Sequence, residues 1–224
     1  VKFTPAAGAV NASPTVQDTK TGTTTVGIIG KDCVVLAADQ RAVMGHIADK
    51  GVVKVYPLTD YVGVTIAGTV GDSLALIRFL RAQANLYEIE RETKITPNAL
   101  ASLLSNVLNN NRYYPFIFQP ILGGMNSAPE LFEITPYGGI MKKDDYAITG
   151  SGTTFAMTTL DQDYKKDLSE IDAIALAVKA VSAAKNRDIY SGGESVTVIV
   201  FDKNGHRTIN RKEIDKVISK IKFN

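Results

Sequence analysis

Thr23 stands at a sharp change of composition and is a candidate nucleophile. Residues 1–22 are rich in Ala, Thr, Gly and Pro, whereas Thr23-Thr24-Thr25-Val26-Gly27-Ile28-Ile29 opens a β-branched run. A threonine hydroxyl is a poor nucleophile at neutral pH and needs a base. If residues 1–22 are a leader that is cut away, the freed amine of Thr23 could be that base, because its ordinary pKa is about 7.7–8.0.

Other short motifs do not support a competing chemistry. Gly71-Asp72-Ser73-Leu74 matches a serine esterase motif, but neither His46 nor His206 supplies the downstream Asp-x-x-His that those enzymes need. Asp72 or Ser73 is better explained as a residue that starts a helix. Gly150-Ser151-Gly152 lacks the third glycine of a dinucleotide-binding loop, and the sequence contains no P-loop and no G-x-S-x-G elbow. Nucleotide binding and α/β-hydrolase chemistry are therefore not expected.

Composition narrows the class of protein. The 224 residues are 45% hydrophobic, enough for one large domain with a substantial core, and 25 Lys and Arg nearly balance 23 Asp and Glu. Neither a nucleic acid nor a membrane is therefore an expected partner. Cys33 is the only cysteine and the two histidines are far apart, so we expect no disulfide, no metal site and no cofactor. These features favour a cytoplasmic protein.

Strand-like segments fill the first part of the chain and return after a helical region. They are β-branched or apolar runs between turn signals such as Gly30-Lys31-Asp32. The segments that we predict as strands are 24–29, 33–38, 52–56, 61–67, 116–122, 131–135, 146–149, 195–201 and 206–209.

Helical periodicity is strongest over residues 71–91, where apolar residues recur every three or four positions. We expect further helices after Thr96, from about Thr153, after Ser169 and from about residue 210. Strand blocks alternate with helix pairs rather than forming strict βαβ units. This order predicts an α+β fold in which helices cover antiparallel sheet, although periodicity does not fix the number of layers.

Several motifs, taken in order along the chain, resemble the sequences of proteasome β-type subunits. They are Gly22-Thr23-Thr24-Thr25-Val26-Gly27, Ala37-Ala38-Asp39-Gln40-Arg41, Thr65-Ile66-Ala67-Gly68 with Gly71-Asp72, Thr149-Gly150-Ser151-Gly152, and Asn186-Arg187-Asp188-Ile189-Tyr190-Ser191-Gly192-Gly193. Each motif alone is weak, whereas their shared order is specific. The resemblance runs from Thr23 nearly to the C-terminus.

The resemblance implies a catalytic set and the role of each member. Thr23 would be the nucleophile, and the Lys54 ammonium would favour its alkoxide while keeping the terminal amine free to accept a proton. Asp39 would hold that lysine by a charge-assisted hydrogen bond. The other implied members are Gly68, as the oxyanion donor, and Ser151, Asp188 and Ser191, which would orient the amine and a proton-relay water. The loop around Gly45-His46-Ile47 is a residue shorter than in many relatives, so Lys50 is the alternative to Lys54.

The resemblance also implies a substrate pocket and a cleavage site. The family's first substrate pocket maps onto an apolar set, Ala42, Val52, Ile66 and Val70, which favours cleavage after large hydrophobic residues. The chain would divide into a leader, residues 1–22, and a catalytic domain, residues 23–224. Removal of the leader would need Thr23 Oγ1 to attack the Gly22 carbonyl. While the two residues are joined, the Thr23 nitrogen is an amide, so we expect this form to be inactive towards added peptides.

The fold and assembly follow from the same resemblance. It implies the four-layer αββα sandwich of N-terminal-nucleophile hydrolases and stacked seven-membered rings of proteasome α subunits and other β subunits. A regulatory ATPase would act through the α ring, and the substrates would be unfolded polypeptides. The plain form of the chain resembles archaeal or actinobacterial members. Two alternatives stay open: a non-catalytic ring subunit, and an N-terminal-nucleophile amidase that acts on a small molecule.

Overall fold

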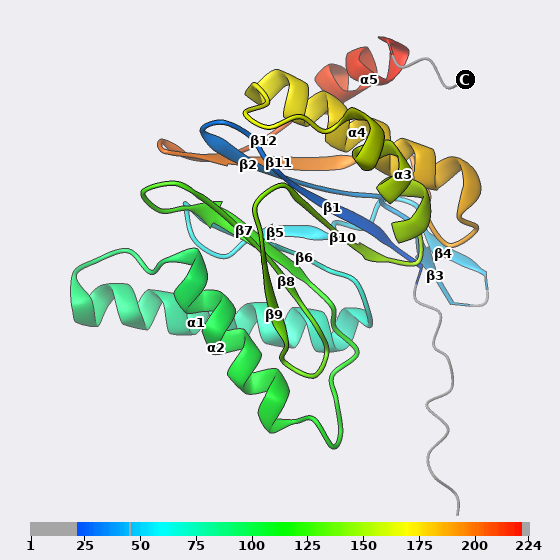
Figure 1. Ribbon diagram of the computed structural model, residues 1–224. Helices are drawn as coiled ribbons and strands as arrows, with labels where there is room; N and C mark the ends of the chain where they lie inside the picture. The colour runs from blue at the N-terminus through cyan, green and yellow to red at the C-terminus, as the bar shows by residue number, and fades with distance from the viewer. Residues whose placement is uncertain (1–21, 45, 221–224) are drawn as a thin grey trace, which may run out of the picture.

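The computed structural model describes residues 22–44 and 46–220. Of the expected leader, only Gly22 lies among the described residues. Two five-stranded antiparallel sheets lie face to face, and helices cover both outer faces (Figure 1). This arrangement is the four-layer αββα sandwich expected from the sequence. None of the helices in the described part of the chain has the length and apolar character that a membrane crossing requires.

The first sheet carries the segment that contains Thr23. Its strands lie in the order β10 (Tyr146–Gly150), β1 (Thr24–Ile29), β2 (Cys33–Ala38), β11 (Thr197–Asp202) and β12 (Gly205–Thr208). Strands β1 and β2 have the predicted bounds and form a hairpin in which Thr25 lies opposite Ala38. Side chains alternate along β1, so Val26 packs against the outer helices and Thr25 points towards the second sheet.

The second sheet has the strand order β5 (Val55–Pro57), β6 (Val62–Thr65), β7 (Ile121–Met125), β8 (Pro129–Ile134) and β9 (Ile140–Lys143). A separate two-stranded sheet, β3 (Ala42–Val43) and β4 (Ile47–Asp49), lies near the start of β1 (Figure 1), and Ala42, Val43 and Ile47 line the same cavity as Thr23. The ends of β5 and β6 and this small sheet therefore surround the segment that begins at Thr23.

Two helices cover the second sheet and three cover the first (Figure 1). Helices α1 (Val70–Arg91) and α2 (Pro97–Asn110) pack on the second sheet, and α3 (Thr153–Asp163), α4 (Glu170–Arg187) and α5 (Arg211–Lys220) pack on the first. The predicted caps are present, because Thr96 Oγ1 accepts from Ala99 N at 3.1 Å and Ser169 Oγ accepts from Asp172 N at 3.2 Å.

Three apolar layers hold the sandwich together. One lies between each sheet and its helices, and the third lies between the two sheets, where Leu36 and Phe201 are fully buried. Successive side chains of a strand point to opposite faces of its sheet. Val35 therefore packs under α4, while its neighbour Leu36 packs in the layer between the sheets. Ala38 and Val55, the chain neighbours of Asp39 and Lys54, belong to the layer between the sheets.

The observed strands differ from the predicted ones at several bounds and in three additional strands. The strand predicted over 52–56 begins at Val55, because the preceding segment bonds elsewhere, Val52 N donating to Gln40 O at 3.0 Å. The strand predicted over 116–122 begins at Ile121, directly after Pro120, which has no N–H to donate. Strands β3, β4 and β9 were not predicted, because they are short and mostly exposed and so lack an alternating pattern.

Candidate active site

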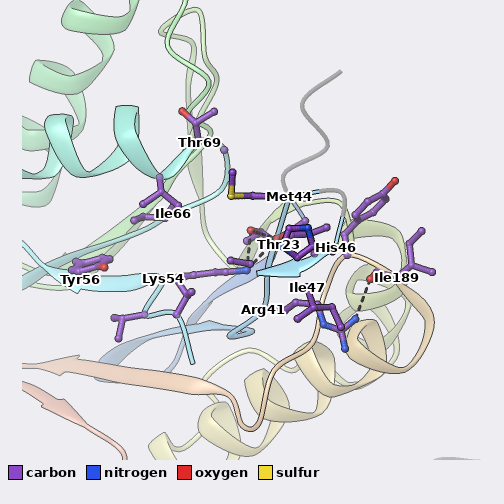
Figure 2. Close-up of a pocket in the computed structure, with 18 residues that line it drawn as sticks. Thr23, Arg41, Met44, His46, Ile47, Lys54, Tyr56, Ile66, Thr69 and Ile189 are labelled. Carbon is purple, nitrogen blue, oxygen red and sulfur yellow. Dashed lines mark hydrogen bonds between the residues drawn. The ribbon is translucent and has the colours of Figure 1, made fainter. Parts of the chain in front are cut away.

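Thr23, Asp39 and Lys54 converge from three different elements. Thr23 precedes β1, Asp39 follows β2, and Lys54 precedes β5. Lys54 Nζ lies 3.1 Å from Thr23 Oγ1 and 2.9 Å from Asp39 Oδ1. Figure 2 shows the Lys54 side chain extended towards Thr23. A hydroxyl in direct contact with a lysine amine is placed for activation as a nucleophile.

Asp39 is fully buried and accepts four hydrogen bonds. Its Oδ1 atom accepts from Lys54 Nζ and from Thr24 N, each at 2.9 Å. Its Oδ2 atom accepts from Gly192 N at 2.8 Å and Arg41 N at 3.1 Å. Backbone donors satisfy a buried carboxylate without neutralising it, so its charge remains available to Lys54. Asp39 therefore fixes both the position and the electrostatic surroundings of that lysine.

The surroundings of Lys54 lower the affinity of its amine for a proton. Burial lowers the pKa of Lys54 below its ordinary value, and the charge and hydrogen bond of Asp39 oppose this effect only in part. A lysine with a lowered pKa exchanges a proton more readily near neutral pH. The alternative lysine, Lys50, is exposed on the surface, and the structure brings only Lys54 to Thr23.

Ser151, Asp188 and Ser191 form a second hydrogen-bonded cluster at the Thr23 nitrogen. Ser151 Oγ accepts from Thr23 N at 3.2 Å and donates to Asp188 Oδ2 at 2.6 Å. Ser191 Oγ donates to the same carboxylate oxygen at 2.5 Å. Because Ser191 uses its only proton there, Thr24 Oγ1 is the donor in the 2.6 Å contact with Ser191 Oγ. The cluster ties the Thr23 nitrogen to a buried carboxylate.

Gly68 has a backbone that only glycine tolerates and an N–H that the sheet does not use. Its φ of +134° is unfavourable for other residues, and a Cβ would lie 1.9 Å from Ile117 O. Gly68 and Phe118 form an isolated bridge whose two hydrogen bonds come from Thr69 N and Gln119 N. Gly68 N–H therefore points away from that partner, as an oxyanion donor must.

Gly22 fits tightly against the backbone of Tyr190. A Cβ on Gly22 would lie 2.0 Å from Tyr190 Cβ and 2.4 Å from its carbonyl oxygen, so no side chain fits there. The Gly22 carbonyl oxygen accepts from Lys54 Nζ at 3.1 Å and from Thr23 Oγ1 at 2.6 Å. The peptide group that joins Gly22 to Thr23 is thus held inside the site by the same lysine.

A cavity of about 1040 Å³ opens beside Thr23. The four residues expected in the substrate pocket, Ala42, Val52, Ile66 and Val70, all line it, together with Gly68. Figure 2 shows Ile66, Met44 and Tyr56 around the same space. The charged side chains among the described lining residues are basic, Arg41 and Lys54, and none is a carboxylate. The cavity is suited to an apolar side chain and offers no counter-charge for a basic one.

Several residues of the site were not predicted from the sequence, among them Thr24, Tyr190 and Tyr56. Thr24 joins the Asp188 cluster, Tyr190 packs on Gly22, and Tyr56 lines the cavity. Strand alternation puts Thr24 on the face of Val26, but a contact with Ser191 depends on the loop after α4. The motif Gly71-Asp72-Ser73-Leu74 belongs to α1, where the Asp72 carboxylate accepts from Ile117 N at 2.9 Å instead of capping the helix.

Comparisons with known proteins agree on one family. A family model described as Proteasome subunit matches residues 19–200. Proteasome subunit beta of Methanocaldococcus vulcanius is 43% identical over 205 residues, which cover 90% of this chain and 92% of that protein. Proteasome subunit beta 2 of Thermococcus onnurineus is 44% identical over 191 residues, 85% of this chain and 95% of that protein. Proteasome subunit beta 1 of Pyrococcus furiosus is 44% identical over 190 residues, 84% and 96% respectively.

Proposed function

This chain belongs to the proteasome subunit family, as a β subunit of the 20S core, and we propose that it is a catalytic subunit with a threonine nucleophile. The observation that carries the proposal is the 3.1 Å contact between Lys54 Nζ and Thr23 Oγ1, with Asp39 held behind the lysine. A subunit that served only for assembly would have no need of a buried lysine and aspartate aimed at one hydroxyl. The reaction is hydrolysis of peptide bonds.

In the processed form, the base is the amine of Thr23. Freed from Gly22, it has a basic lone pair and takes the proton of Thr23 Oγ1, directly or through a water molecule. Thr23 Oγ1 attacks the substrate carbonyl, and Gly68 N–H stabilises the oxyanion. The amine then protonates the leaving nitrogen, and a water molecule hydrolyses the ester on Thr23. Ser151, which contacts the Thr23 nitrogen at 3.2 Å, orients the amine throughout.

Removal of the leader uses the same nucleophile on the chain itself. Thr23 Oγ1 attacks the carbonyl carbon of Gly22, the bond from that carbon to the Thr23 nitrogen breaks, and the nitrogen gains a proton. The resulting ester is hydrolysed by water, which leaves a Gly22 carboxylate and a free amine on Thr23. Residues 1–22 are thus the leader and residues 23–224 the catalytic domain.

Lys54 is the base for this first step, because the Thr23 nitrogen is still an amide. Its Nζ contacts both Thr23 Oγ1 and the Gly22 carbonyl oxygen at 3.1 Å, so one group can take the proton and then polarise the carbonyl. Burial lowers its pKa, which increases the neutral fraction that can accept a proton. Gly22 is needed because any side chain there would collide with Tyr190.

The substrates are unfolded polypeptides that present a large hydrophobic side chain to the cavity. Burial of such a side chain contributes about 1.5–3 kcal/mol, whereas an unpaired charge there is unfavourable. Membership of the family places the chain in the rings of the 20S core with α subunits. Entry of substrates is proposed to depend on a regulatory ATPase docked on the α ring.

Substitution of the nucleophile tests the proposal. Thr23→Ala should lower peptide hydrolysis by purified, assembled particles by at least about 10³-fold and should prevent leader removal. Thr23→Ser keeps a hydroxyl and should retain measurable activity. Because both variants keep the strand and its hydrogen bonds, particle assembly serves as the control. Peptide hydrolysis by the Ala variant at the wild-type rate would contradict the assignment.

A further inference from the structure

Three threonine hydroxyls form a polar chain inside the apolar layer between the two sheets. Thr25 on β1, Thr149 on β10 and Thr65 on β6 are each at most 1% exposed. Their neighbours in this layer are apolar side chains such as Leu36 and Ile121. A buried hydroxyl is costly unless it is hydrogen-bonded, and valine would fill the same space without that cost. The three hydroxyls therefore need an explanation other than packing.

The hydroxyls are linked in a row that crosses from one sheet to the other. Ile121 N donates to Thr65 Oγ1 at 2.9 Å, and Thr65 Oγ1 donates to Thr25 Oγ1 at 3.2 Å. Thr25 Oγ1 and Thr149 Oγ1 then lie 2.6 Å apart within the first sheet. In the part of the chain that the structure describes, the Thr65 to Thr25 bond is the only hydrogen bond between strands of the two five-stranded sheets.

The strand pairing around Thr65 leaves its hydroxyl proton free to bond to Thr25. Strands β6 and β7 pair as far as Val64 with Leu122, and the next pair in that register would be Thr65 with Ile121. At this point the ladder is replaced, because the Ile121 N–H goes to the Thr65 hydroxyl. The hydroxyl proton is thereby left for Thr25, across the layer.

The bond joins the two halves of the catalytic site. Thr25 is two residues from Thr23 on one sheet. On the other sheet, Thr65 is three residues before Gly68 and lies opposite Val55, the neighbour of Lys54. An apolar layer is non-directional and does not by itself fix how two sheets sit along each other, whereas a hydrogen bond is directional. A displacement of about 1 Å at a catalytic centre can cost about 10²-fold in rate.

We propose that Thr65 is a positioning residue that, through Thr25, fixes the nucleophile of the first sheet against the lysine and the oxyanion donor of the second. Thr65 does not contact the reacting atoms. It acts by setting the separation of Thr23 Oγ1 from Lys54 Nζ and from Gly68 N. The inference rests on the proposed function of Thr23.

The test compares variants that break different bonds in the row. Thr65→Val removes both of its hydrogen bonds, whereas Thr25→Val removes the bond between the sheets and the bond to Thr149 and leaves Ile121 N bonded to Thr65. In assembled particles, each should lower kcat by about 10-fold or more and leave KM within about 2-fold. Thr65→Ser keeps the hydroxyl and should restore kcat to near the wild-type value. The double variant should be no slower than the slower single variant, because each single variant already breaks the same bond between Thr65 and Thr25.

A matched control separates positioning from stability. Thr135 Oγ1 also accepts a backbone N–H, from Gly139 at 2.9 Å, but in the turn between β8 and β9. Thr135→Val should leave kcat unchanged, and its Tm is the reference for the loss of such a bond. If Thr65→Val does not assemble, Thr25→Val carries the test. Wild-type kcat in either folded variant, or losses that add in the double variant, would overturn the inference. Failure of the Thr23 assignment would instead appear as peptide hydrolysis by the Thr23→Ala particle.

Discussion

The two sides of the cavity at Thr23 differ in burial and in the kind of contact that holds them. Thr23, Asp39 and Lys54 are 3%, 0% and 4% exposed, and hydrogen bonds of 2.9–3.1 Å join them. Elsewhere on the cavity wall, Met44 and Val53 are 77% and 47% exposed, and their side chains are apolar. Hydrogen bonds hold individual atoms in place on the first side, as the proposed chemistry requires, whereas the second side offers an apolar surface on which substitutions are easier to accommodate. Substitutions on the two sides should therefore differ in size and in the kinetic constant that they affect.

The largest effect is expected at Lys54. Lys54→Met removes the proposed proton acceptor and leaves Asp39 buried without its partner, so leader removal and peptide hydrolysis should each fall by about 10²- to 10⁴-fold. Lys54→Arg keeps the positive charge but cannot lose its proton, so it should also fail to process. Rates are measured on assembled particles by intact mass and by a fluorogenic peptide.

Lys50→Met is the matched control for these variants. Lys50 is exposed, and its contact with the rest of the protein is a backbone bond, Glu194 N donating to its carbonyl at 3.1 Å. Its substitution should leave both rates unchanged. A large loss in Lys50→Met, with little loss in Lys54→Met, would transfer the catalytic role to Lys50.

The next largest effect is expected at Gly22, where a substitution should slow leader removal but not the turnover of added peptides once the leader is gone. Gly22→Ala would bring a Cβ within 2.0 Å of Tyr190 Cβ, so leader removal should slow by at least about 10²-fold. A chain expressed to begin at Thr23 lacks residue 22 and should keep wild-type turnover. Gly51→Ala is the control, since a Cβ there meets only an Asp49 side-chain oxygen at 3.8 Å. Wild-type processing of Gly22→Ala would show that the contact with Tyr190 is unimportant.

The pH dependence of leader removal reports on the buried side alone. Burial lowers the pKa of Lys54, and Asp39 raises it, with burial the larger effect. In the proposed mechanism the neutral amine of Lys54 is the active form, so the processing rate should rise with pH and level off below the range in which an exposed lysine titrates. Asp39→Asn removes the raising effect, so its midpoint should move to lower pH while its plateau falls. A midpoint that moved upward would contradict this assignment.

The smallest effect is expected for substitutions of the exposed apolar residues that line the cavity. These substitutions should change the preference for one peptide over another instead of the overall rate of cleavage. Wild-type particles should cleave peptides ending in Leu or Tyr faster than those ending in Arg or Glu, by about 10- to 200-fold. Val70→Asp places a carboxylate on the cavity and should narrow the gap for the Arg peptide, whereas Val70→Thr, which is uncharged, should not. Faster turnover of the Arg or Glu peptide by the wild type would contradict the proposal that the cavity binds large hydrophobic side chains.

The sequence predicted the parts of the fold that have strong local signals. Strand β1 is rich in β-branched residues, β2 is a continuous apolar run, and α1, α2 and α4 have apolar periodicity or clear caps. Strand β9 has Lys142 and Lys143 in its four residues and lies at a sheet edge, so it has no buried face to produce a pattern. The register between the two sheets depends on contacts such as Thr65 with Thr25, which no local pattern predicts.

The site shows the same contrast between residues that sequence motifs indicate and contacts that only the folded chain creates. Thr23, Asp39 and Lys54 were proposed from the resemblance, and the structure brings them into contact. Tyr190 was missed because its role is steric and becomes visible only when its backbone is placed against Gly22. Thr24 was missed because the hydroxyl that it meets is far away in sequence. Contacts between distant segments are the information that local sequence patterns do not contain.

Leader removal and turnover can be followed together in one sample, which tests directly whether cleavage creates the active form of Thr23. The chain is assembled with α subunits, and its intact mass and the rate of hydrolysis of a Leu-terminated fluorogenic peptide are recorded over time. We expect the mass to fall by that of residues 1–22 and turnover to rise with the same time course, because the amine of Thr23 exists only after cleavage. Full-rate hydrolysis by particles in which the chain keeps residues 1–22 would contradict it.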